Sequence, residues 1–261
     1  MSKVALITGA SAGIGKELAD IMAADGWDLV LVARRKEALK SMKDELSSKY
    51  GRKVFTFPID LTKSGAAVNL NQLLKKNKLT VDALVNNAGF GSNGAFTDLP
   101  LKNELEMIDL NIRLLTELTH LLLPQLIASK NGILLNVAST AGFQPGPYMA
   151  TYYASKAYVL HFTEAIAEET RKTGLKVSAL CPGATKTEFF DVANMQNASL
   201  AKGKFSPMMS ARKVAEIGYR GALKGKVVNI SGIFNKMLAT SVRVSPRFLV
   251  RKIAAFLNTK K

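Results

Sequence analysis

Residues 3–24 read KVALITGASAGIGKELADIMAA, in which a short apolar run meets a glycine-rich turn and then a helical pattern. The β-branched run KVALIT predicts a strand, and the pattern that follows predicts a helix over residues 16–24. Glycine permits a tight turn and the close approach of backbone N–H groups to a ligand, and the helix N-terminus adds partial positive charge. The stretch therefore predicts a dinucleotide cradle made by Gly9, Ser11, Ala12, Gly13, Ile14 and Gly15. Its spacing is GxxxGxG rather than GxGxxG, and a plain strand-to-helix connector is the alternative.

A second informative stretch is TYYASKA, where Tyr152 and Lys156 stand four residues apart in a long helical pattern. Both side chains should leave the same face of that helix. A phenol has an ordinary pKa of about 10, and a lysine ammonium one turn away is expected to lower it. Such a phenol could protonate a carbonyl oxygen near neutral pH. Tyr153 is the competing candidate, and a solvated helix face without chemistry is the alternative for the pair.

Strand-like and helix-like segments alternate along the chain, which is typical of a parallel sheet covered on both faces. We expect strands near residues 3–8, 28–33, 53–57, 82–85, 132–138, 175–180 and 226–230. We expect helices near residues 15–24, 36–49, 103–128, 151–173 and 211–223. In such open sheets ligands bind beyond the carboxyl ends of the strands.

Short motifs follow one another in a fixed order along this pattern. They are TGASAGIG at residues 8–15, Asp60-Leu61, NNAG at residues 86–89, Asn111, Ser139, YxxxK at residues 152–156, and Pro182-Gly183 with Thr187. In order and spacing this set resembles the short-chain dehydrogenase/reductase family, from about residue 3 to about residue 230. The resemblance implies an α/β fold, a single-domain Rossmann-type doubly wound parallel sheet of about seven strands with helices on both faces. It also implies an oxidoreductase acting on CH–OH groups.

The same resemblance implies the remaining cofactor contacts. It assigns adenine contacts to Asp60 and Leu61, a ribose and backbone contact to Asn87, Ala88 and Gly89, a ribose contact to Lys156 beside Tyr152, and the nicotinamide carboxamide loop to Pro182, Gly183, Thr185 and Thr187. Asn86 and Asn87 could equally cap strand ends, because short amides often satisfy loop backbone groups.

The end of the second expected strand bears on the choice of cofactor. An acidic residue usually holds the ribose 2′-hydroxyl of NAD at this point, but here the chain has Arg34-Arg35-Lys36. Two arginines favour a 2′-phosphate, and Ser11 could add a hydrogen bond to it. The sequence therefore favours NADP(H) over NAD(H), with a solvated basic helix start as the alternative.

Catalytic roles are carried over by resemblance onto Ser139, Tyr152, Lys156 and Asn111. Ser139 and Tyr152 would hold the substrate oxygen, Tyr152 would exchange its proton, and Lys156 would lower the tyrosine pKa. The backbone carbonyl of Asn111 would help to hold a water near Lys156. An asparagine inside a helix costs roughly 0.7 kcal/mol relative to alanine, which a function would explain.

Composition agrees with one globular domain. The chain has 261 residues, of which 48% are hydrophobic and 21% charged, enough for a sizeable core. We expect a catalytic domain over residues 1–230 and a helical extension over residues 231–261 packed on it. No apolar run reaches the roughly 20 residues of a membrane span, and the chain enters its first strand directly after Met1-Ser2, so export is not expected.

Cysteine and histidine usage is sparse. The single cysteine, Cys181, excludes an internal disulfide and suits the cytoplasm, and its place at the end of an apolar strand favours buried packing. His120 and His161 fall in no motif, so we expect no metal site.

The segment after Thr187 is expected to form a substrate lid over about residues 188–210. Its apolar residues suggest an adaptable pocket, although a subunit interface or core packing explains them equally well. These residues are Phe189, Phe190, Met195, Phe205, Met208 and Met209, and the opposite wall is expected from Phe143, Gln144, Pro145 and Tyr148.

Charge is concentrated at the C-terminal end. Residues 201–261 hold fourteen Lys and Arg against one acid, Glu216, so they contribute +13 of the net charge of +16. The segments 233–242 and 244–261 are amphipathic, and a basic amphipathic helix can lie on an anionic membrane, dock on a subunit or attract an anionic substrate. A solvated helix that covers the core is the plainer alternative. Nucleic-acid binding is not expected, because the chain has no recognisable binding motif.

Two classes of function remain open. The first is a carbonyl reductase or alcohol dehydrogenase acting on a small-molecule substrate, within which a 3-oxoacyl reductase and a hydroxysteroid-type enzyme are not separable. The second is a non-catalytic dinucleotide-binding sensor or scaffold. The resemblance also implies a homo-oligomer, a dimer or tetramer, formed through the long helices, and we expect a dimer.

Overall fold

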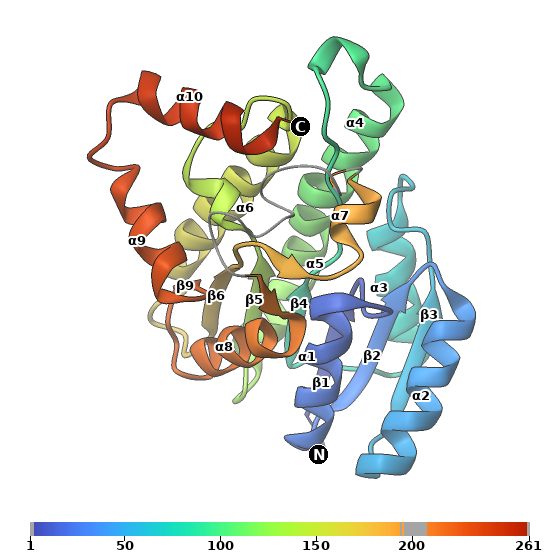
Figure 1. Cartoon of the computed structure of the whole chain (residues 1–261). Coiled ribbons are helices and arrows are strands. Elements are labelled where there is room, and N and C mark those ends of the chain that lie inside the picture. The colour runs from blue at the N-terminus through green and yellow to red at the C-terminus, as the bar shows by residue number, and fades with distance from the viewer. Residues whose placement is uncertain (1–2, 194, 196–207, 260–261) are drawn as a thin grey trace.

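The computed structural model describes residues 3–193, 195 and 208–259. Its main sheet has seven parallel strands in the order β3-β2-β1-β4-β5-β6-β9 (Figure 1). The strands are β1 (Val4–Thr8), β2 (Asp28–Ala33), β3 (Val54–Pro58), β4 (Ala83–Asn86), β5 (Ile133–Val137), β6 (Lys176–Cys181) and β9 (Val228–Ile230). The strand order reverses between β1 and β4, which makes their carboxyl ends the expected ligand-binding edge. All seven predicted strands are confirmed.

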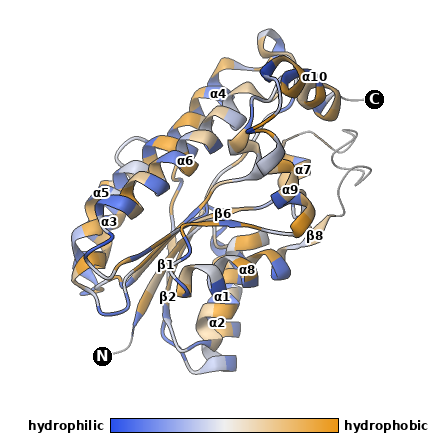
Figure 2. Ribbon diagram, turned by 90° about the vertical axis from the view of Figure 1, so that its left-hand side faces the viewer, coloured by the Kyte–Doolittle hydropathy of each residue, from blue (hydrophilic) through white to orange (hydrophobic). Residues whose placement is uncertain are grey.

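The central strands read as unbroken apolar runs because helices cover both faces of the sheet. Every residue of β1 and β2 is buried. On one face lie α1 (Gly13–Ala24), α2 (Lys36–Tyr50) and α8 (Ala211–Leu223), and on the other lie α3 (Ala66–Lys76), α5 (Leu115–Ala128) and α6 (Ala150–Glu169) (Figure 2). The sequence did not predict α3. The helix predicted over residues 151–173 ends four residues beyond the end of α6.

The helix predicted over residues 103–128 is divided in the structure. It consists of α4 (Leu101–Ile108), a π-helical turn (Asp109–Leu114) and α5. Short π-helical turns inside helices are often found at functional sites. This turn carries Asn111, which is buried.

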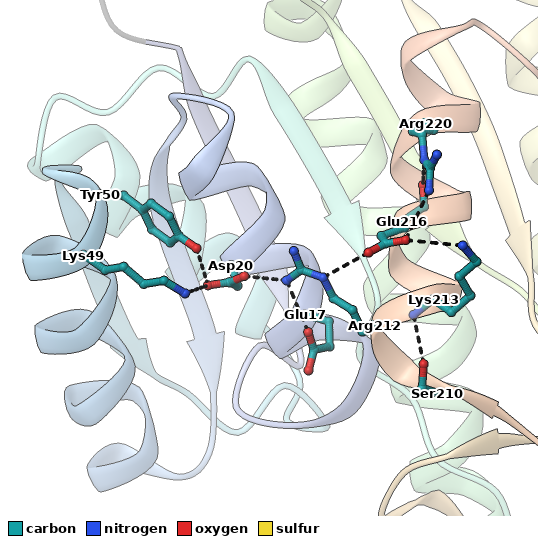
Figure 3. Close-up of polar contacts among 9 residues, drawn as sticks. All are labelled: Glu17, Asp20, Lys49, Tyr50, Ser210, Arg212, Lys213, Glu216 and Arg220. Atoms are coloured by element: carbon teal, nitrogen blue, oxygen red, sulfur yellow. Dashed lines mark hydrogen bonds and ion pairs between the residues drawn. The ribbon is translucent and has the colours of Figure 1, made fainter.

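An ion-pair network fastens α8 to the N-terminal helices (Figure 3). Arg212 on α8 bonds to the carboxylates of Glu17 and Asp20 on α1. Asp20 also accepts hydrogen bonds from Lys49 at 3.1 Å and from Tyr50 at 2.8 Å. Burial raises the pKa of Asp20, but the bonds from Arg212, Tyr50 and Lys49 outweigh it and hold the pKa below its ordinary value.

Short elements surround the carboxyl ends of the strands. They are β7 (Thr185–Lys186), α7 (Phe189–Val192), β8 (Met209–Ser210), α9 (Ile233–Ser241), α10 (Arg247–Asn258) and two 3-10 turns, Phe96–Asp98 and Thr140–Phe143. Figure 1 shows α9 and α10 along one edge of the molecule, with α10 lying above the end of the sheet.

The last residue of α10 anchors that helix. Asn258 is fully buried, and its side chain donates to the Pro147 carbonyl at 3.0 Å and accepts from the Tyr153 hydroxyl at 3.2 Å. Its own carbonyl accepts from Asn93 at 2.9 Å. Because buried polar groups need such partners, these bonds fix where α10 ends.

Candidate active site

The glycine-rich turn after β1 is held by close backbone packing. Gly9 has φ +63°, and a Cβ there would lie 2.9 Å from the Ala88 Cα, so only glycine fits. The Asn87 amide donates to the carbonyls of Thr8 at 2.9 Å and Gly9 at 3.1 Å. Asn87 thus fastens the turn to the end of β4, as a structural amide would.

The turn leads into a helix N-terminus that is available to an anion. The residue before α1, Ala12, makes no side-chain capping bond, and the first turn of α1 contains no acidic residue. The first N–H groups of a helix lack intrahelical partners and carry partial positive charge. A phosphate can therefore be held at this turn, which satisfies the structural requirement for a dinucleotide cradle.

A cleft with a volume of about 450 Å³ lies over this edge of the sheet. It brings together most of the predicted site residues, namely Gly9, Ser11, Ala12, Gly13, Ile14, Arg35, Asn87, Ala88, Gly89, Ser139, Tyr152, Lys156, Pro182, Gly183, Thr185 and Thr187. Gly15, Arg34, Asp60, Leu61 and Asn111 do not line it.

These five residues lie outside the lining of the cleft. The Asp60 carboxylate accepts bonds from the backbone and hydroxyl of Thr62, which outweigh the effect of burial and lower its pKa, while Leu61 is buried in the core. Arg34 is exposed. Gly15 packs against the carbonyl of Gly9, because a Cβ there would lie 2.4 Å from that oxygen.

Tyr152 and Lys156 both point into the cleft from α6, and Ser139 follows β5 beside them. Burial raises the pKa of Tyr152 far above its ordinary value, and a hydrogen bond with Ser139 only partly opposes this. The Ser139 Oγ also accepts from the Ala141 N–H at 3.1 Å, which fixes the serine at the start of the 3-10 turn Thr140–Phe143. The phenol is therefore held protonated.

Lys156 is buried at the base of the same group. Its ammonium donates to the Val137 carbonyl at 2.8 Å and lies 5.8 Å from the centre of the Tyr152 ring. Burial lowers the pKa of Lys156 to about 8. The pKa of Tyr152 is raised and not lowered as expected, because burial of the phenol dominates and the Lys156 ammonium donates to the Val137 carbonyl.

The π-helical turn places Asn111 behind Lys156. The Asn111 amide donates to the Phe90 carbonyl and to Ser155 Oγ, both at 3.0 Å, and its Oδ1 accepts from the Phe90 N–H at 3.2 Å. A Cβ at Gly89 would lie 2.9 Å from this oxygen and 3.4 Å from the Lys156 ammonium. Asn111 thus ties the segment after β4 to α6, and glycine at position 89 leaves room for the lysine.

Arg35 lies at the other end of the cleft. Its guanidinium donates to Ser11 Oγ and to the Ser11 carbonyl, both at 3.2 Å. It also forms a two-pronged ion pair with Glu188 at 3.0 and 3.1 Å. The structure therefore brings two of the three residues predicted for a 2′-phosphate together at the glycine turn.

The remaining walls of the cleft are largely apolar. The expected lid contributes Phe189, Phe190, Val192 and Met195, and α9 and α10 contribute Leu238, Leu249, Ile253 and Leu257. Phe189 packs on the Tyr152 ring with centroids 5.1 Å apart. Of the predicted opposite wall only Gln144 lines the cleft. Met208 packs on the cluster that contains Tyr152 and Phe190, and Met209 packs on the main core. Phe205 lies outside the described residues.

The family model for short chain dehydrogenases matches residues 3–198. This match spans the glycine turn, Ser139, Tyr152 and Lys156. The chain is a short-chain dehydrogenase. It is therefore an oxidoreductase acting on carbonyl or alcohol groups, with a fold that binds a nicotinamide dinucleotide.

Known relatives of this dehydrogenase include several reductases. It is 35% identical over 235 residues to sulfoacetaldehyde reductase 2 of Chromohalobacter salexigens, covering 88% of this chain and 92% of the relative. It is 37% identical over 182 residues to a very-long-chain 3-oxoacyl-CoA reductase of Phaeosphaeria nodorum, covering 67% of this chain and 53% of the relative. The chain thus spans about half the length of that fungal reductase.

Solved structures share the fold of this dehydrogenase over nearly its whole length. A short-chain dehydrogenase from Sphingobium yanoikuyae in complex with NADPH superimposes with a TM-score of 0.82 at 29% identity, covering 95% of this chain and 94% of that one. This match covers more of the chain than the family model, which ends at residue 198.

Cys181 and Asn86 do not line the cleft of the dehydrogenase. Cys181 is fully buried, and burial raises its pKa to about 12, which agrees with packing rather than chemistry. Asn86 is buried and donates to Thr119 and Asn136, so it serves the interior of the sheet. No helix within residues 3–193 or 208–259 is long and apolar enough to cross a membrane.

Sequence reasoning missed the contribution of the C-terminal helices to the cleft. Asn235 on α9 fills the space beside Gly183, where a Cβ would lie 2.3 Å from its amide nitrogen. Val250 and Ala254 form the buried stripe of α10 and also line the cleft. The sequence revealed an amphipathic segment over residues 244–261, but no local signal revealed which of its residues are buried or what the helix covers.

Proposed function

We propose that this dehydrogenase interconverts a carbonyl and a secondary alcohol with NADP(H), on an apolar or acyl-type substrate. The observation that carries the proposal is the grouping of Ser139, Tyr152 and Lys156 in one cleft, with the glycine turn at one end and apolar side chains at the other. A binding module would need the glycine turn but not the half-buried hydroxyl of Ser139 or the buried phenol and ammonium.

The cofactor fits the residues at this edge of the sheet. NADP(H), when bound, supplies or accepts a hydride at its nicotinamide ring. In this proposal the uncapped N-terminus of α1 holds the pyrophosphate, and Lys156 contacts the nicotinamide ribose. Further contacts come from Asp60, Leu61, Asn87, Ala88, Gly89, Pro182, Gly183, Thr185 and Thr187, as the family resemblance implies.

The preference for NADP(H) rests on Arg35. Its guanidinium lies against Ser11 at the glycine turn, where a fork of donors suits a phosphate. Arg34 is exposed beside it and adds positive charge without lining the cleft. The neighbouring structure from Sphingobium yanoikuyae holds NADPH, which supports the same choice.

The chain's own residues handle the oxygen and its proton. Ser139 and Tyr152 would hydrogen-bond to the substrate oxygen, and the protonated Tyr152 would donate its proton to that oxygen in the reductive direction. The Lys156 ammonium stabilises the negative charge left on the tyrosine. The backbone carbonyl of Asn111 holds a water near Lys156, through which the proton is replaced from solvent. In the oxidative direction each step reverses.

The apolar walls favour a substrate with a sizeable apolar part. Phe189 and Phe190 stand on one side and Leu249, Ile253 and Leu257 on the other, and such surfaces stabilise alkyl chains or fused rings by removing them from water. A 3-oxoacyl thioester is one candidate, since relatives of that activity match about two thirds of the chain. A hydroxysteroid-type substrate is the other.

The organisation of the molecule is proposed along the same lines. Residues 1–230 form the catalytic domain, with a lid over about residues 188–210, and residues 231–261 form an extension that belongs to the same domain through the buried Asn258.

The protein acts in the cytoplasm and forms a dimer through α5 and α6. Light scattering that gives a monomer at micromolar concentration would refute the dimer.

The experiment that tests the activity has two stages. Purified protein is titrated with NADPH and with NADH, following energy transfer from the buried Trp27, and ketones, 3-oxoacyl esters and steroids are then added while the absorbance of the reduced cofactor is followed. NADPH binding with turnover supports the proposal. Binding without turnover would favour a sensor or scaffold, and absence of binding would overturn both.

A further inference from the structure

The outward face of α9 is apolar. This helix buries Asn235 and Ala239 against the body of the protein. The opposite side of the helix, about half a turn away, carries Ile233 and Met237, which are 75% and 64% exposed. A surface helix normally places polar residues on its outward side, whereas α9 places apolar residues there.

Further exposed apolar residues lie on α9 and in the segment that follows it. Phe234 is exposed on the same helix, Val244 is 86% exposed in the connection to α10, and Phe248 is 57% exposed in the first turn of α10. Figure 1 shows these elements in sequence along one edge of the molecule. We call Ile233, Phe234, Met237, Val244 and Phe248 the C-terminal apolar surface. None of them lines the cleft, so a substrate bound there would leave them exposed.

Positive charge surrounds this surface. Lys236, Arg243, Arg247, Arg251 and Lys252 are all exposed, and within the described part of the chain none of them has an ion-pair partner. The sequence contains no Asp or Glu after residue 216. The nearest acid in sequence, Glu216, is already bonded to Arg212 and Arg220 on its own helix.

We propose that the C-terminal apolar surface docks on an anionic lipid bilayer. Apolar side chains flanked by lysine and arginine suit the boundary between acyl chains and negatively charged headgroups. A symmetric contact between two copies would bring the same unpaired cations of both copies together, which the charge distribution opposes. The helices that carry this surface also line the mouth of the cleft through Leu238 and Leu249, so docking brings the cleft close to the bilayer.

Co-sedimentation with vesicles tests the proposal without any assay of activity. The full chain is mixed with phosphatidylcholine vesicles and with vesicles that also contain phosphatidylserine, at low and high salt. We expect binding to the anionic vesicles that weakens as salt rises. The pair of substitutions Ile233→Ser and Met237→Ser should weaken this binding by at least about tenfold. Both side chains are largely exposed, so the variant should fold.

A matched control comes from a different helix, α4, which exposes Leu101 and Leu105 at the same i, i+4 spacing. The pair Leu101→Ser and Leu105→Ser should bind the anionic vesicles as the unchanged chain does. Three results would overturn the proposal. They are absence of binding at low salt, equal loss of binding in both variants, or a dimer in light scattering that Ile233→Ser with Met237→Ser converts to a monomer.

Discussion

The guanidinium of Arg35 donates to both carboxylate oxygens of Glu188, at 3.1 and 3.0 Å, although 153 positions separate them. Arg35 follows β2 at the cofactor end of the cleft, and Glu188 precedes α7 at the start of the proposed lid. Both side chains are largely exposed, so the pair contributes less than about 1 kcal/mol to stability. The pair matters because it joins the cofactor end of the cleft to the start of the proposed lid.

The first prediction concerns competition for Arg35. A 2′-phosphate at Ser11 would need the guanidinium that Glu188 now holds, so Glu188→Gln should tighten NADPH binding by about two- to fivefold. Arg35→Gln should weaken NADPH binding by roughly 10- to 100-fold, because it removes a charge-assisted hydrogen bond. NADH binding, measured by the same fluorescence titration, should change little.

Arg34→Gln is the matched control for Arg35, because this neighbouring arginine does not line the cleft. It should weaken NADPH binding much less than Arg35→Gln. Weaker NADPH binding in Glu188→Gln would show that the carboxylate supports the site rather than competes for it.

The second prediction separates the two adjacent tyrosines. Tyr152→Phe removes the proton donor and should lower kcat by about 10²- to 10⁴-fold with cofactor binding retained. Tyr153→Phe should stay active, because its hydroxyl bonds to Asn258 rather than to the reacting oxygen. Steady-state kinetics and NADPH titration of both variants measure this, and the reverse pattern would contradict the assignment of Tyr152.

The third prediction follows from the buried ammonium of Lys156. Burial lowers its pKa from the ordinary 10.5 to about 8. Between these two values the unfolded chain binds more protons than the folded chain, so the free energy of unfolding rises with pH across this window. Between pH about 8 and pH about 10 the contribution of Lys156 should amount to about 2 kcal/mol.

Chemical denaturation of the unchanged chain and of Lys156→Met across this range measures the effect. Buried groups that do not interact with Lys156, such as Tyr219 with its raised pKa, act on both proteins alike and cancel in the difference. The difference in unfolding free energy between the unchanged chain and the variant should shift in favour of the unchanged chain as pH rises. A constant difference would show that the ammonium is not desolvated.

The fourth prediction concerns the anchor of α10. Asn258→Ala removes the bonds to Tyr153 and to the Pro147 carbonyl, which should destabilise the docking of α10 by about 1–3 kcal/mol. Because α10 lines the apolar end of the cleft, KM for an apolar substrate should rise while the Kd for NADPH stays the same. Tryptic cleavage at Arg251 or Lys252 should also become faster.

Asn77→Ala provides the comparison, since Asn77 also makes one side-chain bond at the end of a helix but lies at the far end of α3. It should leave KM and the cleavage within α10 unchanged. An equal rise of KM and of the cofactor Kd in Asn258→Ala would mean that the whole cleft, rather than its roof, depends on Asn258.

The strands and most helices could be predicted because each depends on local pattern. The run DLVLVA of β2 is apolar throughout and is buried throughout. The helix α3 was missed, although Ala67, Leu70 and Leu74 repeat at helical spacing and are buried. The π-helical turn at Asn111 was not predicted, and the contact that accompanies it, a bond from the amide to the Phe90 backbone, is a tertiary one that local pattern does not encode.

The candidate site divides in the same way. Motifs such as YxxxK placed Tyr152 and Lys156 in the cleft, but the raised tyrosine pKa depends on burial that spacing does not encode. The role of Asn258 could not be predicted, because its partners lie more than a hundred residues away. Arg35 was predicted together with Arg34, and only the direction of the side chains separates them.

The roof of the cleft comes from a part of the chain that the family model does not match. The family model ends at residue 198, whereas α9 and α10, which close the apolar end, come from residues 233–258. Substitutions along Leu249, Ile253 and Leu257 can therefore reshape what the enzyme accepts while the proton-transfer residues stay unchanged. Enzymes that share these catalytic residues could therefore differ in substrate through substitutions in the last helix alone.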